Sequence, residues 1–127
     1  MKKVLATLCA IALSAVTVFA GEYPDISIAE LKTAIAAKTV TVIDVNGGSS
    51  YARGHVPTAI NFAEAKADLA AKLPADKGAL VVAYCGGPSC SAYTRAADAA
   101  KELGYTNIKH LSAGISGWLQ AGEATEK

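Results

Sequence analysis

The stretch Ala79-Leu80-Val81-Val82-Ala83-Tyr84 decides the fold, because it is apolar along nearly its whole length. A strand with this pattern is usually covered on both faces, as the central strands of parallel sheets are. The tight loop Cys85-Gly86-Gly87-Pro88-Ser89-Cys90 follows, and then a helical pattern over residues 91–103, which Gly104 ends. A strand, a tight loop and a helix in this order are typical of an α/β domain.

The same alternation of strands and helices continues on both sides of this unit. Ser27-Ile28-Ala29-Glu30 has the pattern of a capping box and predicts a helix over 28–37. Strands are predicted over 40–45, 59–62 and 107–111, and further helices over 64–73 and 115–121. Residues 46–50, rich in Gly and Ser, are expected to end the first of these strands. The sequence therefore predicts an α/β fold with a mainly parallel central sheet flanked by helices.

The helix over 91–103 is expected to bury one face of small and aliphatic side chains against the sheet. At helical spacing that face consists of Ala92, Ala96, Ala99, Ala100 and Leu103. Trp118 has helical spacing from Ile115 and is expected in the core, while His110 at the end of the last strand is expected to be structural or exposed.

Length and composition limit the function classes. The chain has 127 residues, of which 52% are hydrophobic, so it has room for one domain. The formal net charge is +1, which leaves no basic field for nucleic acid. Charged residues amount to only 18%, which argues against disorder.

The first 20 residues have the pattern of a signal peptide. Lys2 and Lys3 form a basic start, an apolar run extends from Val4 to Phe19, and small residues at Ala20 and Gly21 supply a cleavage signal. The alternative is an uncleaved membrane anchor, for which the run is a little short. We expect residues 1–20 to be removed after Ala20, leaving a domain over 21–127 in the bacterial periplasm, with no membrane attachment after cleavage.

The Cys85 loop has the features that activate a thiol. Cys85 stands at a strand end, two glycines follow it, and a helix begins about six residues on. Helix N-termini lower the pKa of a thiol, and glycines let several backbone N–H groups turn toward one anion. Pro88 has no N–H, so such a cradle would use the amides of the remaining loop residues Gly86, Gly87, Ser89, Cys90 and Ser91. This pattern suits a thiolate or a persulfide.

Two other interpretations of the loop remain open from the residues alone. Cys85 and Cys90 are either a structural disulfide or two ordinary thiols, and a bond across so short a loop would constrain the unfolded chain only modestly. A metal site is disfavoured, because the mature chain offers only these two cysteines, His55 and His110 as soft or imidazole ligands.

Several stretches together resemble the rhodanese domain family. They are Val42-Ile43-Asp44-Val45, Tyr51-Ala52-Arg53-Gly54-His55-Val56-Pro57-Thr58-Ala59-Ile60-Asn61, Val81-Val82-Ala83-Tyr84-Cys85, Leu103-Gly104-Tyr105-Thr106-Asn107-Ile108 and Ser112-Ala113-Gly114-Ile115-Ser116-Gly117-Trp118. The resemblance covers nearly all of residues 21–127. It implies a rhodanese-like three-layer fold and a single-domain sulfurtransferase.

The resemblance also implies roles for particular residues. Cys85 matches the family cysteine that holds a sulfane sulfur as a persulfide and passes it to a thiophile. The loop residues that would bind the substrate are Gly86, Gly87, Pro88, Ser89, Cys90 and Ser91. Candidates for organising or lining the site around them are Asp44, Arg53, His55 and Arg95. No metal and no organic cofactor is implied.

The chain departs from the family pattern at informative positions. Asn46 stands where many members have arginine, Thr58 replaces a glycine, and Cys90 stands where the loop usually carries a basic residue. Arg95 is the nearby cation, either folded back toward the loop or solvated. A phosphatase on this fold would need an arginine to clamp phosphate, but Ser91 occupies that place.

The sequence therefore predicts a sulfurtransferase that carries sulfane sulfur on Cys85. Its partners would be a small sulfur donor and a thiophilic acceptor, with an acceptor protein as one option, and no nucleic acid. The alternative is a thiol–disulfide redox protein or sensor that uses Cys85 and Cys90. A third interpretation, a silent rhodanese-like binding module, is disfavoured because Cys85 is intact.

Overall fold

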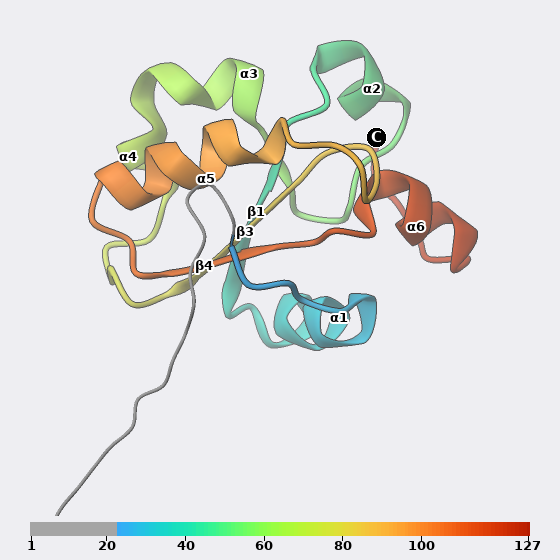
Figure 1. The fold of residues 1–127 in the computed structure, drawn as a ribbon, viewed down its shortest axis with the longest axis horizontal. Coiled ribbons are helices and arrows are strands. Elements are labelled where there is room, and N and C mark those ends of the chain that lie inside the picture. Colours follow the sequence, from blue (N-terminus) through green and yellow to red (C-terminus); the bar gives the residue numbers. More distant parts are fainter. Residues whose placement is uncertain (1–22) are drawn as a thin grey trace, which may run out of the picture.

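The structure is a computed structural model that describes residues 23–127. The predicted leader over 1–20 lies outside these residues. A central sheet of four strands carries helices on both faces (Figure 1). Its strands are β1 (Val40–Asp44), β2 (Ile60–Asn61), β3 (Leu80–Tyr84) and β4 (Asn107–His110), all of them within the predicted ranges. The spatial order is β2-β1-β3-β4 and every pairing is parallel, which confirms the predicted α/β class.

Strand β3 lies inside the sheet, as its apolar sequence predicts. It pairs with β1 from Leu80 to Tyr84 and with β4 from Leu80 to Ala83. Val81 and Ala83 enter one core, whereas Val82 and Tyr84 enter the other. All four are fully buried because successive side chains of a strand point to opposite faces and both faces are covered.

The two faces of the sheet are covered by different helices (Figure 1). Helix α1 (Ile28–Ala37) and helix α6 (Gly114–Gln120) supply Leu31 and Trp118 to one core. On the other face lie α3 (Phe62–Ala65), a 3₁₀ turn (Lys66–Asp68), α4 (Leu69–Lys72) and α5 (Tyr93–Glu102), which bury Leu69 and Ala96. No helix within residues 23–127 combines the length and the apolar character that a membrane span needs.

Local signals place helix α1 as predicted. The Ser27 hydroxyl accepts a hydrogen bond from the Glu30 amide at 3.0 Å, and the Glu30 carboxylate accepts one from the Ser27 amide at 3.1 Å. The capping box is therefore complete, and the helix starts at Ile28 and ends at Ala37 as expected.

Three expectations about helices need correction. Residues 46–50 do break β1, but α2 (Gly48–Arg53) begins inside them. The single helix expected over 64–73 is divided, because the backbone of Asp68 (φ −137°, ψ 45°) leaves the helical region. Helix α5 begins at Tyr93 rather than Ser91, and its buried face is rotated from the expected one. It buries Tyr93, Ala96, Ala97 and Ala100, while Leu103 is 36% exposed.

Candidate active site

Cys85 lies at the carboxyl edge of the sheet, directly after β3. From there the chain runs toward α6 and returns to the start of α5 (Figure 1). Ligands of open parallel sheets gather at this edge, where the strands end. The segment from Cys85 to Ala92 between β3 and α5, here called the Cys85 loop, is therefore placed where the sequence predicted it.

The Cys85 loop is closed by a disulfide between Cys85 and Cys90, whose Cα atoms are 6.3 Å apart. The loop curls back because the Cys90 amide donates a hydrogen bond of 3.1 Å to the carbonyl oxygen of Gly87. Cys85 is only 2% exposed and packs in the core with Tyr93, whereas Cys90 is half-buried at the edge of that core. The structure thus represents the oxidised state of the pair, one of the alternatives that the sequence left open.

Helix α6 holds the beginning of the Cys85 loop, a contact that sequence reasoning missed. The amides of Ile115 and Ser116 donate hydrogen bonds of 3.0 and 2.9 Å to the carbonyl oxygens of Cys85 and Gly86. Gly114 allows this approach, since a Cβ atom there would lie 2.5 Å from the carbonyl carbon of Gly86. Its φ of +63° also favours glycine. The small residues Ser112, Ala113 and Gly114 indicate a turn before a helix, but they do not reveal this contact.

Most amides of the Cys85 loop have no partner within residues 23–127. The Cys90 amide binds the Gly87 carbonyl, but four other amides donate to no group of the described chain; they belong to Gly86, Gly87, Ser89 and Ser91. Together with Cys90 these are the residues predicted to cradle an anion. Four of the five amides that the sequence proposed as donors therefore have no hydrogen-bond partner in the described chain.

Asp44 organises the carboxyl edge of the sheet through hydrogen bonds. It is fully buried, and its Oδ2 accepts a hydrogen bond of 2.6 Å from the Tyr84 hydroxyl. Its Oδ1 accepts one of 2.7 Å from the Asn46 amide. The Tyr84 oxygen also accepts a hydrogen bond of 3.0 Å from the Val56 amide. Burial, and then the bond to Asp44, raises the pKa of Tyr84, so this hydroxyl keeps its proton as a donor.

His55 is a structural residue of the neighbouring loop. It is 4% exposed, and its ring stacks on that of Tyr51 with the centroids 3.6 Å apart. Its Nδ1 lies 2.8 Å from the Tyr51 carbonyl oxygen. The backbone of His55 pairs with Glu126, which ties this loop to the C-terminal segment. These contacts hold His55 between Tyr51 and the C-terminal segment.

The structure does not bring the side chain of Arg53 or Arg95 to the Cys85 loop through any polar contact; the Arg95 amide donates a hydrogen bond of 3.1 Å to the Ala92 carbonyl oxygen. Both side chains are exposed, and neither forms a hydrogen bond or an ion pair with another residue of the described chain. Of the two alternatives for Arg95, the solvated one describes this structure. Within residues 23–127, no group of three or more His, Cys, Asp or Glu side chains is placed to hold a metal ion.

A pocket of ≈ 370 Å³ lies against the outer side of the Cys85 loop. His110, one of its lining residues, is 8% exposed and stacks on Tyr93 with the ring centroids 3.4 Å apart. The other lining residues are Tyr23, Pro88, Ser89, Cys90, Ser91, Tyr93, Thr94 and Ser112. The sequence did not assign His110 to the site, although β4 ends at the same sheet edge as β3.

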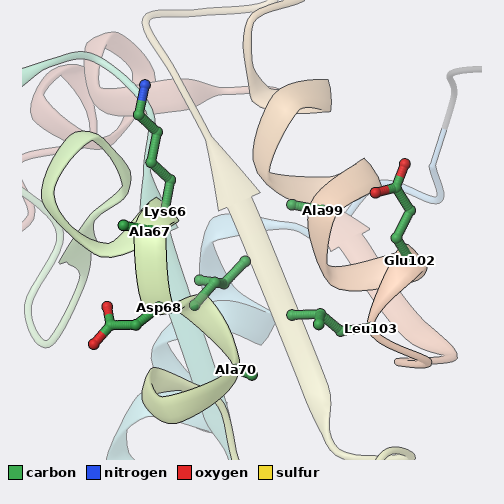
Figure 2. Close-up of a pocket in the computed structure, with 8 residues that line it drawn as sticks. Lys66, Ala67, Asp68, Ala70, Ala99, Glu102 and Leu103 are labelled. Atoms are coloured by element: carbon green, nitrogen blue, oxygen red, sulfur yellow. The ribbon is translucent and has the colours of Figure 1, made fainter.

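A second groove, of ≈ 280 Å³, lies far along α5 from the cysteines. It is lined by Lys66, Asp68 and Leu69 from one side and by Ala99, Glu102 and Leu103 from the other (Figure 2). These last three residues are at the C-terminal end of α5, whereas the Cys85 loop leads into its N-terminal end. A ten-residue helix is about 15 Å long, so this groove is not part of the cysteine site.

Comparisons with known proteins agree with the fold and the sequence pattern. The chain is 35% identical over 113 residues to an HTH-type transcriptional regulator of Mycobacterium tuberculosis, a match that covers 88% of this chain and 49% of the regulator. It therefore spans about half the length of that relative. It is also 29% identical over 100 residues to a thiosulfate sulfurtransferase of Shewanella oneidensis, with 78% of this chain and 95% of the relative covered.

Solved structures show the same fold. A Bacillus halodurans protein superimposes with a TM-score of 0.65 at 27% identity, covering 82% of this chain and 77% of that one. A human single-domain sulfurtransferase superimposes with a TM-score of 0.61 at 22% identity, covering 76% and 96%. Residues 27–121 match the family model of the rhodanese-like domain. The chain therefore belongs to the rhodanese-like family.

Proposed function

We propose that this chain is a sulfurtransferase whose reduced Cys85 carries sulfane sulfur as a persulfide. The observation that carries the proposal is the position of Cys85, at the end of the central strand and at the start of a curled loop with unpartnered amides. The membership in the rhodanese-like family and the similarity to a thiosulfate sulfurtransferase support the reaction class.

The first half-reaction loads the cysteine. The Cys85 thiolate attacks the outer sulfur of a donor such as a polysulfide, and the donor's inner sulfur leaves with the electron pair of the broken S–S bond. The product, Cys85–S–S⁻, carries its negative charge on the terminal sulfur. The free amides of Gly86, Gly87, Ser89 and Ser91 stabilise that charge as preorganised donors do in an oxyanion hole.

The second half-reaction releases the sulfur. A thiophilic acceptor, such as cyanide or a thiolate, attacks the terminal sulfur of the persulfide. The S–S bond breaks, its electron pair returns to Cys85, and the acceptor leaves as thiocyanate or as a new persulfide. Because Cys85 is fully buried, an acceptor reaches the terminal sulfur of the persulfide more readily than it reaches the Cys85 sulfur.

The proposal includes export to the periplasm. Its support is the basic start, apolar run and small-residue cleavage signal of residues 1–20. Amino-terminal sequencing of protein recovered from the periplasmic fraction should begin at Gly21. An intact Met1 on membrane-bound protein would overturn the export of a free domain.

The disulfide favours a second candidate, a thiol–disulfide redox protein that uses Cys85 and Cys90. If the chain is a sulfurtransferase, the reduced protein should react with polysulfide and then yield one thiocyanate per loaded sulfur when cyanide is added. A Cys85→Ser variant should yield none above the uncatalysed reaction, whereas Cys90→Ser should still turn over. Equal thiocyanate yields from wild type and Cys85→Ser would refute the sulfurtransferase and leave the redox function.

A further inference from the structure

We propose that the pocket beside Cys90 docks the cysteine-bearing segment of a protein dithiol, whose thiolate attacks the Cys90 sulfur and releases Cys85 as the leaving thiolate. The proposal deepens the proposed function, on which it rests for its purpose, by assigning how the oxidised site recovers its nucleophile. Residues on both sides of the disulfide determine which of the two sulfurs is attacked.

The two sulfurs differ in access. Cys90 lines the pocket of ≈ 370 Å³, and Cys85 does not. Cys85 is 2% exposed and packs in the same core as Tyr93 and Ala96. Thiol–disulfide exchange requires the attacking sulfur to approach from the side opposite the S–S bond, so buried neighbours hinder attack on Cys85. Attack at Cys90 can begin from the pocket.

The two sulfurs also differ as leaving groups. Exchange is faster when the departing thiol has a low pKa. Attack at Cys90 makes Cys85 depart, at the end of β3 and beside the unpartnered amides of Gly86 and Gly87. Amides of this kind stabilise a thiolate, as they would stabilise the persulfide. Access and leaving-group stability therefore both favour attack on the Cys90 sulfur.

The electrons balance in two steps. The partner's first thiolate forms a mixed disulfide with Cys90, and the electron pair of the Cys85–Cys90 bond goes to Cys85. The partner's second thiol, as its thiolate, then attacks its own sulfur in the mixed disulfide, and Cys90 departs and takes a proton from water. The net result is that a protein dithiol is oxidised to a disulfide while Cys85 and Cys90 are reduced.

The lining of the pocket fits a polypeptide segment better than a small anionic thiol. Among residues 23–127, no Asp, Glu, Lys or Arg side chain lines it, and its wall includes several hydroxyl groups and aromatic rings, among them those of Tyr93 and His110. The Tyr23 hydroxyl, also from the lining, donates a hydrogen bond to the carboxylate of Asp98. The amide of Ser112, another lining residue, donates a hydrogen bond to the carboxylate of Asp25. An anion such as glutathione therefore meets no cationic side chain among the described lining residues and two carboxylates beside them.

One buried polar atom of the pocket wall lacks a partner. Nε2 of His110 is fully buried and has no hydrogen-bond partner within residues 23–127, although the side chain is held by stacking on Tyr93. A buried polar atom without a partner costs free energy, so a docked segment that reached it would gain a hydrogen bond.

The regiochemistry is tested by trapping the mixed disulfide. The probe is a thioredoxin-type dithiol protein whose second cysteine is replaced by alanine, mixed with the oxidised chain and quenched with an alkylating reagent. Both cysteines lie in the tryptic segment 78–95, and fragmentation between them assigns each modification. We expect the probe on Cys90 and the alkyl group on Cys85. The reverse assignment would overturn the proposal.

The pocket is tested with matched threonine variants. Thr94 lines the pocket and donates its hydroxyl to Ser91, while Thr33 makes the same kind of backbone hydrogen bond on α1. Thr94→Glu should slow reduction by the unmodified dithiol protein by about tenfold, and Thr33→Glu should not, because the added charge and bulk meet the partner only at Thr94. Equal rates for both variants would contradict docking in this pocket.

Two controls separate this proposal from the proposed function. Reduction by uncharged 2-mercaptoethanol should be similar in all variants, and glutathione should react more slowly than the dithiol protein. A faster reaction with glutathione would identify a small thiol as the reductant and overturn the docked segment. Chemically reduced protein takes up sulfur on Cys85 without the reduction step proposed here. If this persulfide loading failed, the sulfurtransferase function would be refuted, but the reduction by a docked dithiol protein would not.

Discussion

The Tyr84 hydroxyl donates a hydrogen bond of 2.6 Å to the buried carboxylate of Asp44, and so joins the ends of the two central strands at the edge where Cys85 begins its loop. Tyr84 directly precedes Cys85, and its oxygen also accepts the Val56 amide at 3.0 Å. One phenol therefore fixes β1, β3 and the loop that contains His55. Tyr84 packs in the core and is also a structural support of the carboxyl edge of the sheet.

Replacing Tyr84 with phenylalanine should weaken both the fold and the site. The change leaves an Asp44 oxygen and the Val56 amide without their partner, and unsatisfied buried groups cost about 1–3 kcal/mol. Urea unfolding should show this loss together with slower sulfur transfer. Tyr105→Phe is the control, because that hydroxyl bonds the Pro74 carbonyl away from the Cys85 loop. Equal losses of transfer in the two variants would contradict the role assigned to Tyr84.

Gly114 should resist substitution more strongly than a glycine with a similar backbone. Gly114 and Gly122 both have positive φ, +63° and +78°, but only Gly114 has backbone atoms where a Cβ would be placed. Gly122→Ala should cost about 1–2 kcal/mol from conformation alone. Gly114→Ala should cost about 1–3 kcal/mol more from overpacking, and should also reduce sulfur transfer. If Gly114→Ala and Gly122→Ala had indistinguishable unfolding midpoints, the close packing of Gly114 against the Cys85 loop would not contribute to stability.

The stability of the fold should fall in mild acid because of His110. Burial lowers the pKa of its imidazole below the ordinary 6.5, although nearby Asp25 opposes the shift. At pH values between the folded and the unfolded pKa of His110, the unfolded chain therefore binds more protons than the folded chain. Stability is therefore complete above the unfolded pKa of 6.5 and is lost as the pH falls through the folded pKa.

Urea midpoints measured at about pH 7.5 and about pH 5.5 test this dependence, with His110→Phe as the comparison. Phenylalanine preserves an aromatic ring against Tyr93 and does not titrate. Wild type should lose more stability than the variant between these two conditions. The same loss in both proteins would assign the acid sensitivity to other groups.

Thiosulfate should be a poor donor compared with polysulfide. It is a dianion, and neither the Arg53 nor the Arg95 side chain makes a polar contact with the Cys85 loop. Cys90→Arg places a cation in the loop and should lower the KM for thiosulfate by about tenfold relative to Cys90→Ser, which removes the disulfide without adding charge. A low thiosulfate KM in wild type would contradict this inference.

Local patterns were sufficient to predict most of the fold. The capping box at Ser27 and Glu30 defines α1, and the apolar stretch before Cys85 defines β3 as a strand covered on both faces. Position at a sheet edge and loop composition were also sufficient to place Cys85 and the candidate amides. These features depend on residues that are near one another in the sequence.

Contacts between distant segments could not be predicted in the same way. The bonds from α6 to Cys85 and Gly86 join residues 30 positions apart, and the stacking of His110 on Tyr93 joins residues 17 positions apart. The division of the helix expected over 64–73 follows from the backbone at Asp68, which the periodicity of the alanines and Leu69 does not reveal. Sequence periodicity describes which face is apolar, but not which segment covers it.

The mass of the protein after reaction with polysulfide shows whether Cys85 carries a persulfide. Reduced wild type, Cys90→Ser and Cys85→Ser are each incubated with polysulfide, freed of small molecules and measured intact and as peptides. The account predicts a gain of about 32 Da on Cys85 in wild type and in Cys90→Ser, and none in Cys85→Ser. A loss of about 2 Da in wild type, with no sulfur adduct on Cys85 in either Cys85-containing protein, would contradict the persulfide carrier.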